Sequence, residues 1–300
     1  MANQTISIAG IHPPVATPFT TDGDFDPAAF RRNFARWNEQ PLAGYVVLGS
    51  NGEFPLLSAD ERVEVVQAAR AVIPSDRLLI AGSGMESTRA TIHMTERMAA
   101  AGADVAIVVT PNYYKAKMTG DALEAHYRAV AEAAPVPVLI YNVPVYTAVD
   151  MPADAIIRAS HHPNIIGMKE SGPQMGKIGR IIREAAPGFQ VLTGSASGFL
   201  AALAMGAVGG VMALANFAAA ELVAVMALLR DGDLAGARAI QQRLIEPNFA
   251  VTAKFGIAGL KSALDLLGYR GGPVRSPLQP LTAAEVGELR AILARAEFLD

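Results

Sequence analysis

The chain has 300 residues, of which 51% are apolar and 18% are charged, with no cysteine and a formal net charge of −3. Without cysteine there can be no disulfide, no thiolate metal site, no iron–sulfur cluster and no thiol nucleophile. Because the net charge is small and the basic residues are scattered, we expect neither nucleic acid nor a membrane surface as a partner.

The N-terminal segment 1–10 lacks the features of a targeting sequence. It has no basic region followed by an apolar run, and no amphipathic stretch rich in arginine and serine. No apolar run elsewhere reaches the roughly 20 residues that a membrane-spanning helix needs. We therefore expect a cytoplasmic protein.

Along the chain, short and continuously apolar runs alternate with longer segments of helical periodicity. This alternation is typical of β-α units, and continuous apolarity indicates strands of a parallel sheet that helices cover on its outer face. Strands are predicted at 11–16, 45–48, 78–81, 105–109, 138–141, 165–169, 190–193 and 209–212. Eight such units favour an α/β fold closed into a (β/α)8 TIM barrel, which typically needs about 250 residues.

Several helix boundaries are marked by capping residues. The N-terminal signals are Asp26 before Pro27, Ser58 with Glu61, and Thr282 with Glu285. After the eighth strand, helices are predicted at 219–229, 234–245 and 254–267, with a last one from residue 282. The first of these completes the barrel and the others are additional. We predict one domain, 1–300, with the barrel at about 8–230 and a C-terminal helical extension at about 231–300.

Active sites of such barrels lie at the C-terminal ends of the strands. Polar residues that follow or close predicted strands are therefore the candidates. They are Ser50 and Asn51, Tyr113 and Tyr114, Tyr141 and Asn142, Lys169 and Glu170, and Ser195. Because these strand ends share one mouth of the barrel, their side chains can converge on a single pocket.

Lys169 carries the most specific chemical signal among these candidates. It directly follows an apolar run, so its amine enters a partly desolvated interior that disfavours the charged form. A neutral amine can attack a ketone, and the resulting protonated imine acidifies the neighbouring carbon. The hydroxyls of Tyr141, Ser50 and Tyr113 are suited to relay the protons. Position alone is equally compatible with a lysine that reaches solvent or pairs with Glu170.

Other reaction classes find little support in the sequence. The five histidines show no metal-binding spacing, so no metal site is predicted and a metal-dependent aldolase is disfavoured. Ser195 has no strand-end histidine to act as its base, which argues against a serine hydrolase. The turn at 49–53 can bind a substrate carboxylate through backbone N–H groups, or it can be a plain β-α turn.

Four strand-end motifs resemble the dihydrodipicolinate synthase and N-acetylneuraminate lyase superfamily. They are Gly-Ser-Asn-Gly-Glu at 49–53, Thr-Pro-Asn-Tyr-Tyr at 110–114, Tyr-Asn-Val-Pro at 141–144 and Gly-Met-Lys-Glu-Ser at 167–171. The resemblance covers nearly the whole chain in the same order. It implies a TIM-barrel lyase that forms an imine with a pyruvate-type 2-oxo acid and uses no cofactor besides that covalent imine.

The same resemblance implies roles for individual residues. Lys169 matches the imine lysine, Tyr141 the proton relay and Ser50 the hydroxyl bonded to it. Tyr113 matches a tyrosine that reaches into a neighbouring subunit's site, which implies a tight dimer and a homotetramer built as a dimer of dimers. The residues expected to contact substrate are Asn51, Gly194, Ser171, Tyr146 and Met212.

Two departures bear on the substrate. Tyr146 stands where the synthase has an arginine for the carboxylate of its second substrate, and Asn51 replaces a threonine of the synthase and of the sialic acid lyase. The run Gly-Ser-Asn-Gly-Glu-Phe-Pro at 49–55 is closer to the 4-hydroxy-2-oxoglutarate aldolases.

The first hypothesis is therefore cleavage of a 4-hydroxy-2-oxo acid, such as 4-hydroxy-2-oxoglutarate, to pyruvate and an aldehyde such as glyoxylate. The alternatives are a synthase that condenses pyruvate with aspartate semialdehyde, and another pyruvate-dependent sugar-acid aldolase or dehydratase. A non-catalytic barrel that binds a 2-oxo acid is a further alternative.

Overall fold

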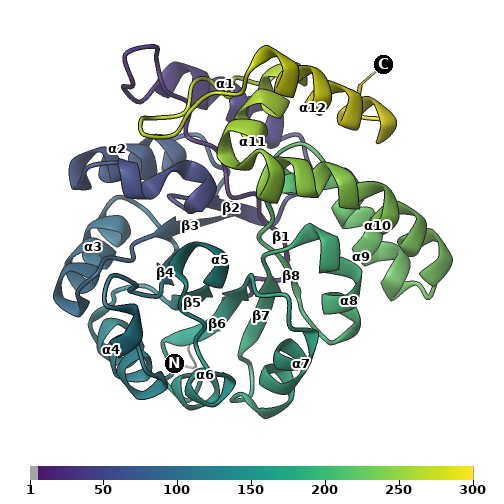
Figure 1. Ribbon diagram of the computed structural model, residues 1–300. Coiled ribbons are helices and arrows are strands. Elements are labelled where there is room, and N and C mark those ends of the chain that lie inside the picture. Colours follow the sequence, from purple (N-terminus) through teal and green to yellow (C-terminus); the bar gives the residue numbers. More distant parts are fainter. Residues whose placement is uncertain (1–5, 300) are drawn as a thin grey trace.

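The computed structural model describes residues 6–299 and shows eight central strands with helices outside them (Figure 1). All eight strands are parallel and follow the order β1-β8-β7-β6-β5-β4-β3-β2. Their bounds are β1 (Gly10–Ile11), β2 (Gly44–Val47), β3 (Leu78–Gly82), β4 (Val105–Val109), β5 (Val138–Asn142), β6 (Ile165–Glu170), β7 (Gln190–Thr193) and β8 (Gly209–Gly210).

The sheet closes into a barrel between β2 and the segment that follows β1. Pro14 and Val46 form an isolated parallel bridge, the Val15 N–H donates to the Val46 carbonyl at 2.9 Å, and the Val46 N–H donates to the Pro13 carbonyl at 3.0 Å. The predicted (β/α)8 barrel with C-terminal helices is thus confirmed.

Two predicted strands are too long. The strand predicted at 11–16 ends at Ile11, because Pro13 and Pro14 have no N–H to donate to a ladder. The strand predicted at 209–212 ends at Gly210, although the Val211 N–H still donates to the Thr193 carbonyl. The other six strands agree with the predicted bounds to within one residue.

Twelve α-helices are described in residues 6–299, and the predicted capping residues are confirmed. The Asp26 side chain accepts the Ala29 N–H, and capping boxes form at Ser58 and at Thr282. The helices are α1 (Pro27–Trp37), α2 (Ala59–Arg70), α3 (Thr88–Ala100), α4 (Gly120–Ala133), α5 (Pro144–Thr147), α6 (Ala153–Ala159), α7 (Met175–Glu184), α8 (Phe199–Ala204), α9 (Ala219–Arg230), α10 (Leu234–Phe249), α11 (Gly256–Leu266) and α12 (Ala283–Arg295).

The C-terminal helices differ in detail from the prediction. The helix expected at 234–245 continues through Pro247 to Phe249, and a π-helix, η6 (Ala250–Lys254), follows it directly. Pro247 cannot donate an intrahelical hydrogen bond, and the wider π turn begins three residues later, at Ala250. The helix expected at 254–267 consequently begins at Gly256.

The extension lies against the outside of the barrel beside α1 (Figure 1). The rings of Trp37 and Tyr269 stack with centroids 5.7 Å apart. Asn33 Nδ2 donates to the Arg270 carbonyl at 2.8 Å, and the Arg270 N–H donates back to Asn33 Oδ1 at 2.8 Å. Stacking and paired hydrogen bonds thus tie the segment after α11 to the first barrel helix.

Closure buries strand residues on both faces. Every residue of β2, β5 and β6 is buried, including Lys169 and Glu170 at the carboxyl end of β6. A charged group in such a place requires either a compensating partner or a neutral form. None of the helices in residues 6–299 combines the length and the apolar character needed to cross a bilayer.

Two buried histidines should make the fold sensitive to acid. Burial lowers the pKa of His12 and of His126 from 6.5 to about 4. As the pH falls below 6.5 the unfolded chain binds these protons first, so stability present above pH 6.5 is lost progressively down to about pH 4. Between about pH 6.5 and 5, we expect each histidine to account for about 2 kcal/mol of this loss.

His126→Gln removes one titrating group. Between about pH 6.5 and 5, the free energy of unfolding of this variant should therefore fall by about 2 kcal/mol less than that of the wild type. Urea denaturation at fixed protein concentration measures the difference. His93→Gln, at an exposed site on α3, is the matched control and should leave the wild-type dependence unchanged. Equal slopes for the wild type and His126→Gln would contradict the assignment.

Candidate active site

Ser50, Tyr141 and Lys169 meet at the carboxyl mouth of the barrel. Lys169 is 4% exposed, and its Nζ lies 4.1 Å from the centroid of the Tyr141 ring. Tyr141 and Lys169 are register partners on β5 and β6, and the Tyr141 hydroxyl lies 3.2 Å from Ser50 Oγ. Strand pairing therefore places the amine against the tyrosine, and the turn after β2 adds the serine hydroxyl.

Glu170 does not pair with Lys169, because successive strand residues point to opposite faces. Its carboxylate forms an ion pair with Lys177 Nζ at 3.0 Å, and it accepts Asn142 Nδ2 at 2.8 Å and the Gly172 N–H at 2.6 Å. Lys169 itself forms no ion pair within residues 6–299. The buried carboxylate is compensated, whereas the buried amine beside it has only an aromatic face.

Because Gly194 has no side chain, the Ser171 hydroxyl has space to lie beside Lys169. A Cβ at position 194 would lie 1.9 Å from Ser171 Oγ and 3.1 Å from Lys169 Cε. Such approaches are shorter than van der Waals contact, so any larger residue would displace the serine. The structure therefore brings these two expected pocket residues together at the amine.

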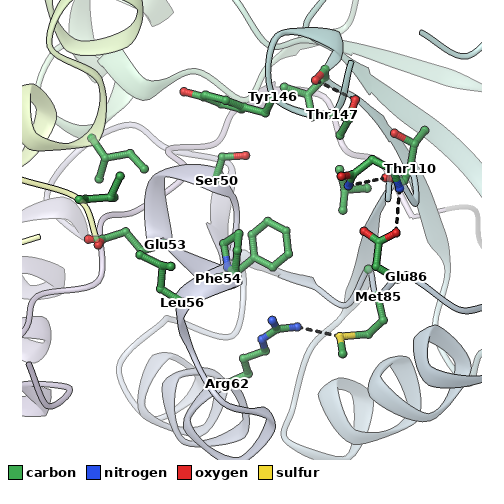
Figure 2. A pocket seen from close by; sticks show the side chains of 17 residues that line it. Ser50, Glu53, Phe54, Leu56, Arg62, Met85, Glu86, Thr110, Tyr146 and Thr147 are labelled. Atoms are coloured by element: carbon green, nitrogen blue, oxygen red, sulfur yellow. Dashed lines mark hydrogen bonds between the residues drawn. The ribbon is translucent and has the colours of Figure 1, made fainter. Parts of the chain in front are cut away.

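A cavity of about 520 Å³ opens next to this cluster, which is large enough for a small organic acid (Figure 2). Ser50 and Tyr146 line it. Tyr141 and Lys169 line a much smaller internal cavity of about 10 Å³. Phe54, Gly84 and Val109 line both, and so form the wall between them.

Tyr146 lies at the rim of the large cavity, on α5 directly after β5. Its side chain is 56% exposed, yet its phenol end is partly buried, and this burial raises its pKa, with the nearby Tyr141 hydroxyl raising it further. A neutral phenol can donate or accept a hydrogen bond, but it cannot neutralise a carboxylate. The loop after β5 therefore contributes no positive charge to the cavity.

Arg62, on α2, is the one cation that lines the large cavity within residues 6–299. It is buried, and desolvation lowers its pKa. Its Nη1 donates to Met85 Sδ at 2.9 Å and its Nε to the Leu57 carbonyl at 3.3 Å, and Figure 2 shows it directed toward Met85. No sequence pattern indicated Arg62, because it stands on a helix and not at a strand end.

Five expected site residues line neither cavity in the single chain: Gly194 and Ser171, which lie beside Lys169, and Tyr113, Asn51 and Met212. Tyr113 is 74% exposed, and its ring packs edge-on against Tyr114. Asn51 lies half-buried in η1 (Ser50–Gly52), and Met212 is fully buried in the hydrophobic core. The expected reach of Tyr113 into another subunit and the expected carboxylate contact of Asn51 stay predictions. Within residues 6–299, no group of three or more histidines and carboxylates is arranged to hold a metal ion.

A closed β/α barrel that presents a buried amine beside a tyrosine–serine hydroxyl pair defines a TIM-barrel lyase. Residues 7–296 match the model of the dihydrodipicolinate synthetase family, and the chain belongs to this family. Members are pyruvate-dependent lyases, so the protein is an enzyme of that class.

Relatives that bear the names of two different enzymes have similar sequence identity to this chain. The 4-hydroxy-tetrahydrodipicolinate synthase of Methanothrix thermoacetophila is 34% identical over 287 residues, which cover 95% of this chain and 96% of that protein. The probable mitochondrial 4-hydroxy-2-oxoglutarate aldolase of Emericella nidulans is 36% identical over 297 residues, covering 97% and 94%. A prophage protein of the dihydrodipicolinic acid synthase family from E. coli K12, solved in complex with pyruvate, superposes with a TM-score of 0.91 at 28% identity over 98% of this chain and 100% of that one.

Gly194→Ala should disable the site without unfolding the barrel. Displacement of Ser171 and of the Lys169 side chain should slow borohydride trapping of pyruvate by about 10-fold or more, since a misplacement of about 1 Å costs up to roughly 100-fold. Gly287→Ala, in α12 where a Cβ meets nothing within 4 Å, is the control and should trap at the wild-type rate. Wild-type trapping by Gly194→Ala would show that the close contact has no role.

Proposed function

We propose that the protein is a Schiff-base aldolase that cleaves a 4-hydroxy-2-oxo acid, such as 4-hydroxy-2-oxoglutarate, to pyruvate and an aldehyde such as glyoxylate. The observation that carries the proposal is the buried amine of Lys169, which has no ion-pair partner among residues 6–299 and lies beside the bonded hydroxyls of Tyr141 and Ser50. No cofactor besides the covalent imine is proposed.

In the first step, Lys169 Nζ attacks the C2 carbonyl of the substrate, and loss of water leaves a protonated imine. The neutral form of the amine is the nucleophile in this step. Tyr141 lines the small cavity with Lys169, and its bonded partner Ser50 lines the large one, so we assign these two hydroxyls the proton that moves to the departing water.

In the second step, a proton leaves the C4 hydroxyl and the C3–C4 bond breaks. The electron pair of that bond passes to C3 and the imine nitrogen becomes that of an enamine, while C4 departs as the aldehyde. Protonation at C3 and addition of water to the imine then release pyruvate and restore the Lys169 amine. The Tyr141–Ser50 pair is assigned the proton transfers at both oxygen atoms.

The carboxylate of the 2-oxo acid is assigned to the turn after β2. The backbone N–H groups of Ser50 and Asn51 donate to no carbonyl within residues 6–299, which leaves them available to an anion. Ser171, which Gly194 holds near Lys169, is assigned a further contact to the substrate.

A synthase that condenses pyruvate with aspartate semialdehyde is the second candidate, and the name of the Methanothrix relative favours it. The imine chemistry is shared, so the two differ at the aldehyde. Tyr146 replaces the arginine that the synthase pattern requires there. Arg62, the one cation that lines the cavity within residues 6–299, lies across the cavity from Tyr146 (Figure 2). We therefore rank cleavage of the hydroxy-oxo acid first.

We also propose that the active form is a homotetramer assembled as a dimer of dimers. Tyr113, Tyr114 and Val145 are 74%, 72% and 78% exposed, and all three follow strands β4 and β5 near the mouth. Such a group of exposed apolar side chains is typical of a subunit contact.

Lys169→Ala should abolish covalent capture of pyruvate. Borohydride reduction in the presence of pyruvate should add the mass of the reduced adduct to the wild-type peptide that contains Lys169, and to no other. Lys117→Ala, at an exposed position before α4, is the control and should trap at full stoichiometry. Full trapping and turnover by Lys169→Ala would overturn the proposal.

The aldehyde that the enzyme uses distinguishes the aldolase from the synthase. Pyruvate release from 4-hydroxy-2-oxoglutarate and condensation of pyruvate with aspartate semialdehyde should be compared on one preparation by kcat/KM. We expect cleavage to exceed condensation by about 10-fold or more, because the arginine that holds aspartate semialdehyde in the synthase pattern is replaced here by Tyr146. The reverse ratio would assign the synthase activity, and activity with neither substrate would favour another aldolase or a non-catalytic barrel.

A further inference from the structure

Glu53 ends the turn that carries Ser50 and Asn51. Both its backbone conformation and its burial are unfavourable for a glutamate. Its backbone is left-handed, with φ 58°, a conformation that residues with a Cβ seldom adopt. The residue as a whole is also only 1% exposed, so a carboxylate is buried directly behind the site. Both features require compensation by neighbouring groups.

The compensating charge comes from Lys261, on helix α11 of the C-terminal extension. Its Nζ lies 2.5 Å from Glu53 Oε1, and the two side chains are 1% and 0% exposed. The ammonium also donates to the Pro273 carbonyl at 2.7 Å and lies 4.2 Å from the centroid of the Phe19 ring. Burial lowers the pKa of Lys261 to about 8, while Glu53 acts in the opposite direction.

A second residue of the extension, Arg275, binds both Glu53 and the residues that follow it, up to the start of α2. Its N–H donates to Glu53 Oε2 at 2.8 Å. Its guanidinium donates to both carboxylate oxygens of Glu61 on α2, at 2.6 and 3.0 Å, and to the Leu56 carbonyl at 2.9 Å. The segment between the active-site turn and α2 is therefore anchored to the extension at both ends.

This anchored segment is part of the large cavity. Glu53, Phe54 and Leu56 line it, and Figure 2 shows them on the same side as Ser50. Ile257 and Leu278, both from the extension, line it as well. The extension thus shapes the cavity both directly and through the turn.

We propose that Glu53 and Lys261 are positioning residues whose buried ion pair holds the Ser50–Asn51 turn in the geometry that binds the substrate carboxylate. Neither residue touches the substrate. The assignment of the carboxylate to this turn rests on the proposed function. Lys169 and Tyr141 are held independently by β5 and β6, so loss of the pair weakens carboxylate binding more than it impairs imine formation.

Lys261→Met and Glu53→Gln test the proposal on the full-length protein. Each should raise the pyruvate concentration for half-maximal borohydride trapping by about 10-fold, since a displaced subsite costs roughly 10- to 100-fold. The reduced adduct should remain on Lys169, and the trapping rate at saturating pyruvate should change by less than about 3-fold. Lys261→Arg keeps the charge and should recover part of the loss.

The matched control is Lys254→Met, which removes the extension's exposed ion pair with Glu288. It should leave half-saturation at the wild-type value. A merely structural role for the Glu53–Lys261 pair predicts a lower melting temperature and a smaller active fraction with unchanged half-saturation, and that result would overturn the proposal. If Lys261→Met does not fold, Glu53→Gln and Lys261→Arg decide by the same readout.

Hydrogen exchange separates this inference from the proposed function. In the absence of pyruvate, the peptide that covers the turn at 50–57 should exchange faster in Lys261→Met and Glu53→Gln than in the wild type or Lys254→Met. If the wild type traps no pyruvate, the proposed function fails, and faster exchange would still support the positioning of the turn by the pair. Wild-type exchange of this peptide in both folded variants would refute it.

Discussion

Burial on both faces of the parallel strands is the constraint on which the rest of this structure depends. Every charged side chain near the barrel mouth therefore requires either a compensating partner or a neutral form. Glu170 is compensated by Lys177 and Asn142. Lys169, its neighbour in sequence, points to the other face of the strand, where it lies against the Tyr141 ring and forms no ion pair within residues 6–299. Glu170 therefore links neighbouring elements at the strand ends, whereas the Lys169 amine has no charged partner in that part of the chain.

The barrel does not form the cavity alone. Residues of the extension complete the cavity wall, and the hydrogen bond from the Arg275 N–H to Glu53 joins positions 222 residues apart in the chain. The Phe19 ring lies 4.2 Å from Lys261 Nζ and 4.4 Å from the Arg275 guanidinium carbon, so an aromatic face shields both cations in an apolar setting. Loop, helix and extension thus behave as one unit behind the active-site turn.

The part of the site around the Lys169 amine and the part that would hold the aldehyde have different physical requirements. The proposed imine chemistry requires an amine and a proton relay in a fixed geometry, whichever aldehyde is used, and similarly close relatives bear the names of two different enzymes. The aldehyde end requires only a cavity of matching shape and charge. In the described part of the chain, residues 6–299, that cavity combines the phenol of Tyr146 with one buried cation, Arg62, and these features distinguish it from the synthase pattern, which has an arginine at position 146.

Local sequence was sufficient for the strands with continuous apolar runs, for the helix caps, and for Lys169, Tyr141 and Ser50, because strand ends in a barrel share one mouth. The proline pair after β1 shortened a strand whose apolar pattern continued. Only the tertiary structure decided that Asn142 and Lys177 compensate Glu170, that Arg62 faces the cavity, and that Lys261 neutralises Glu53. These depend on contacts between distant segments, and local periodicity carries no information about which distant side chain will meet a buried charge.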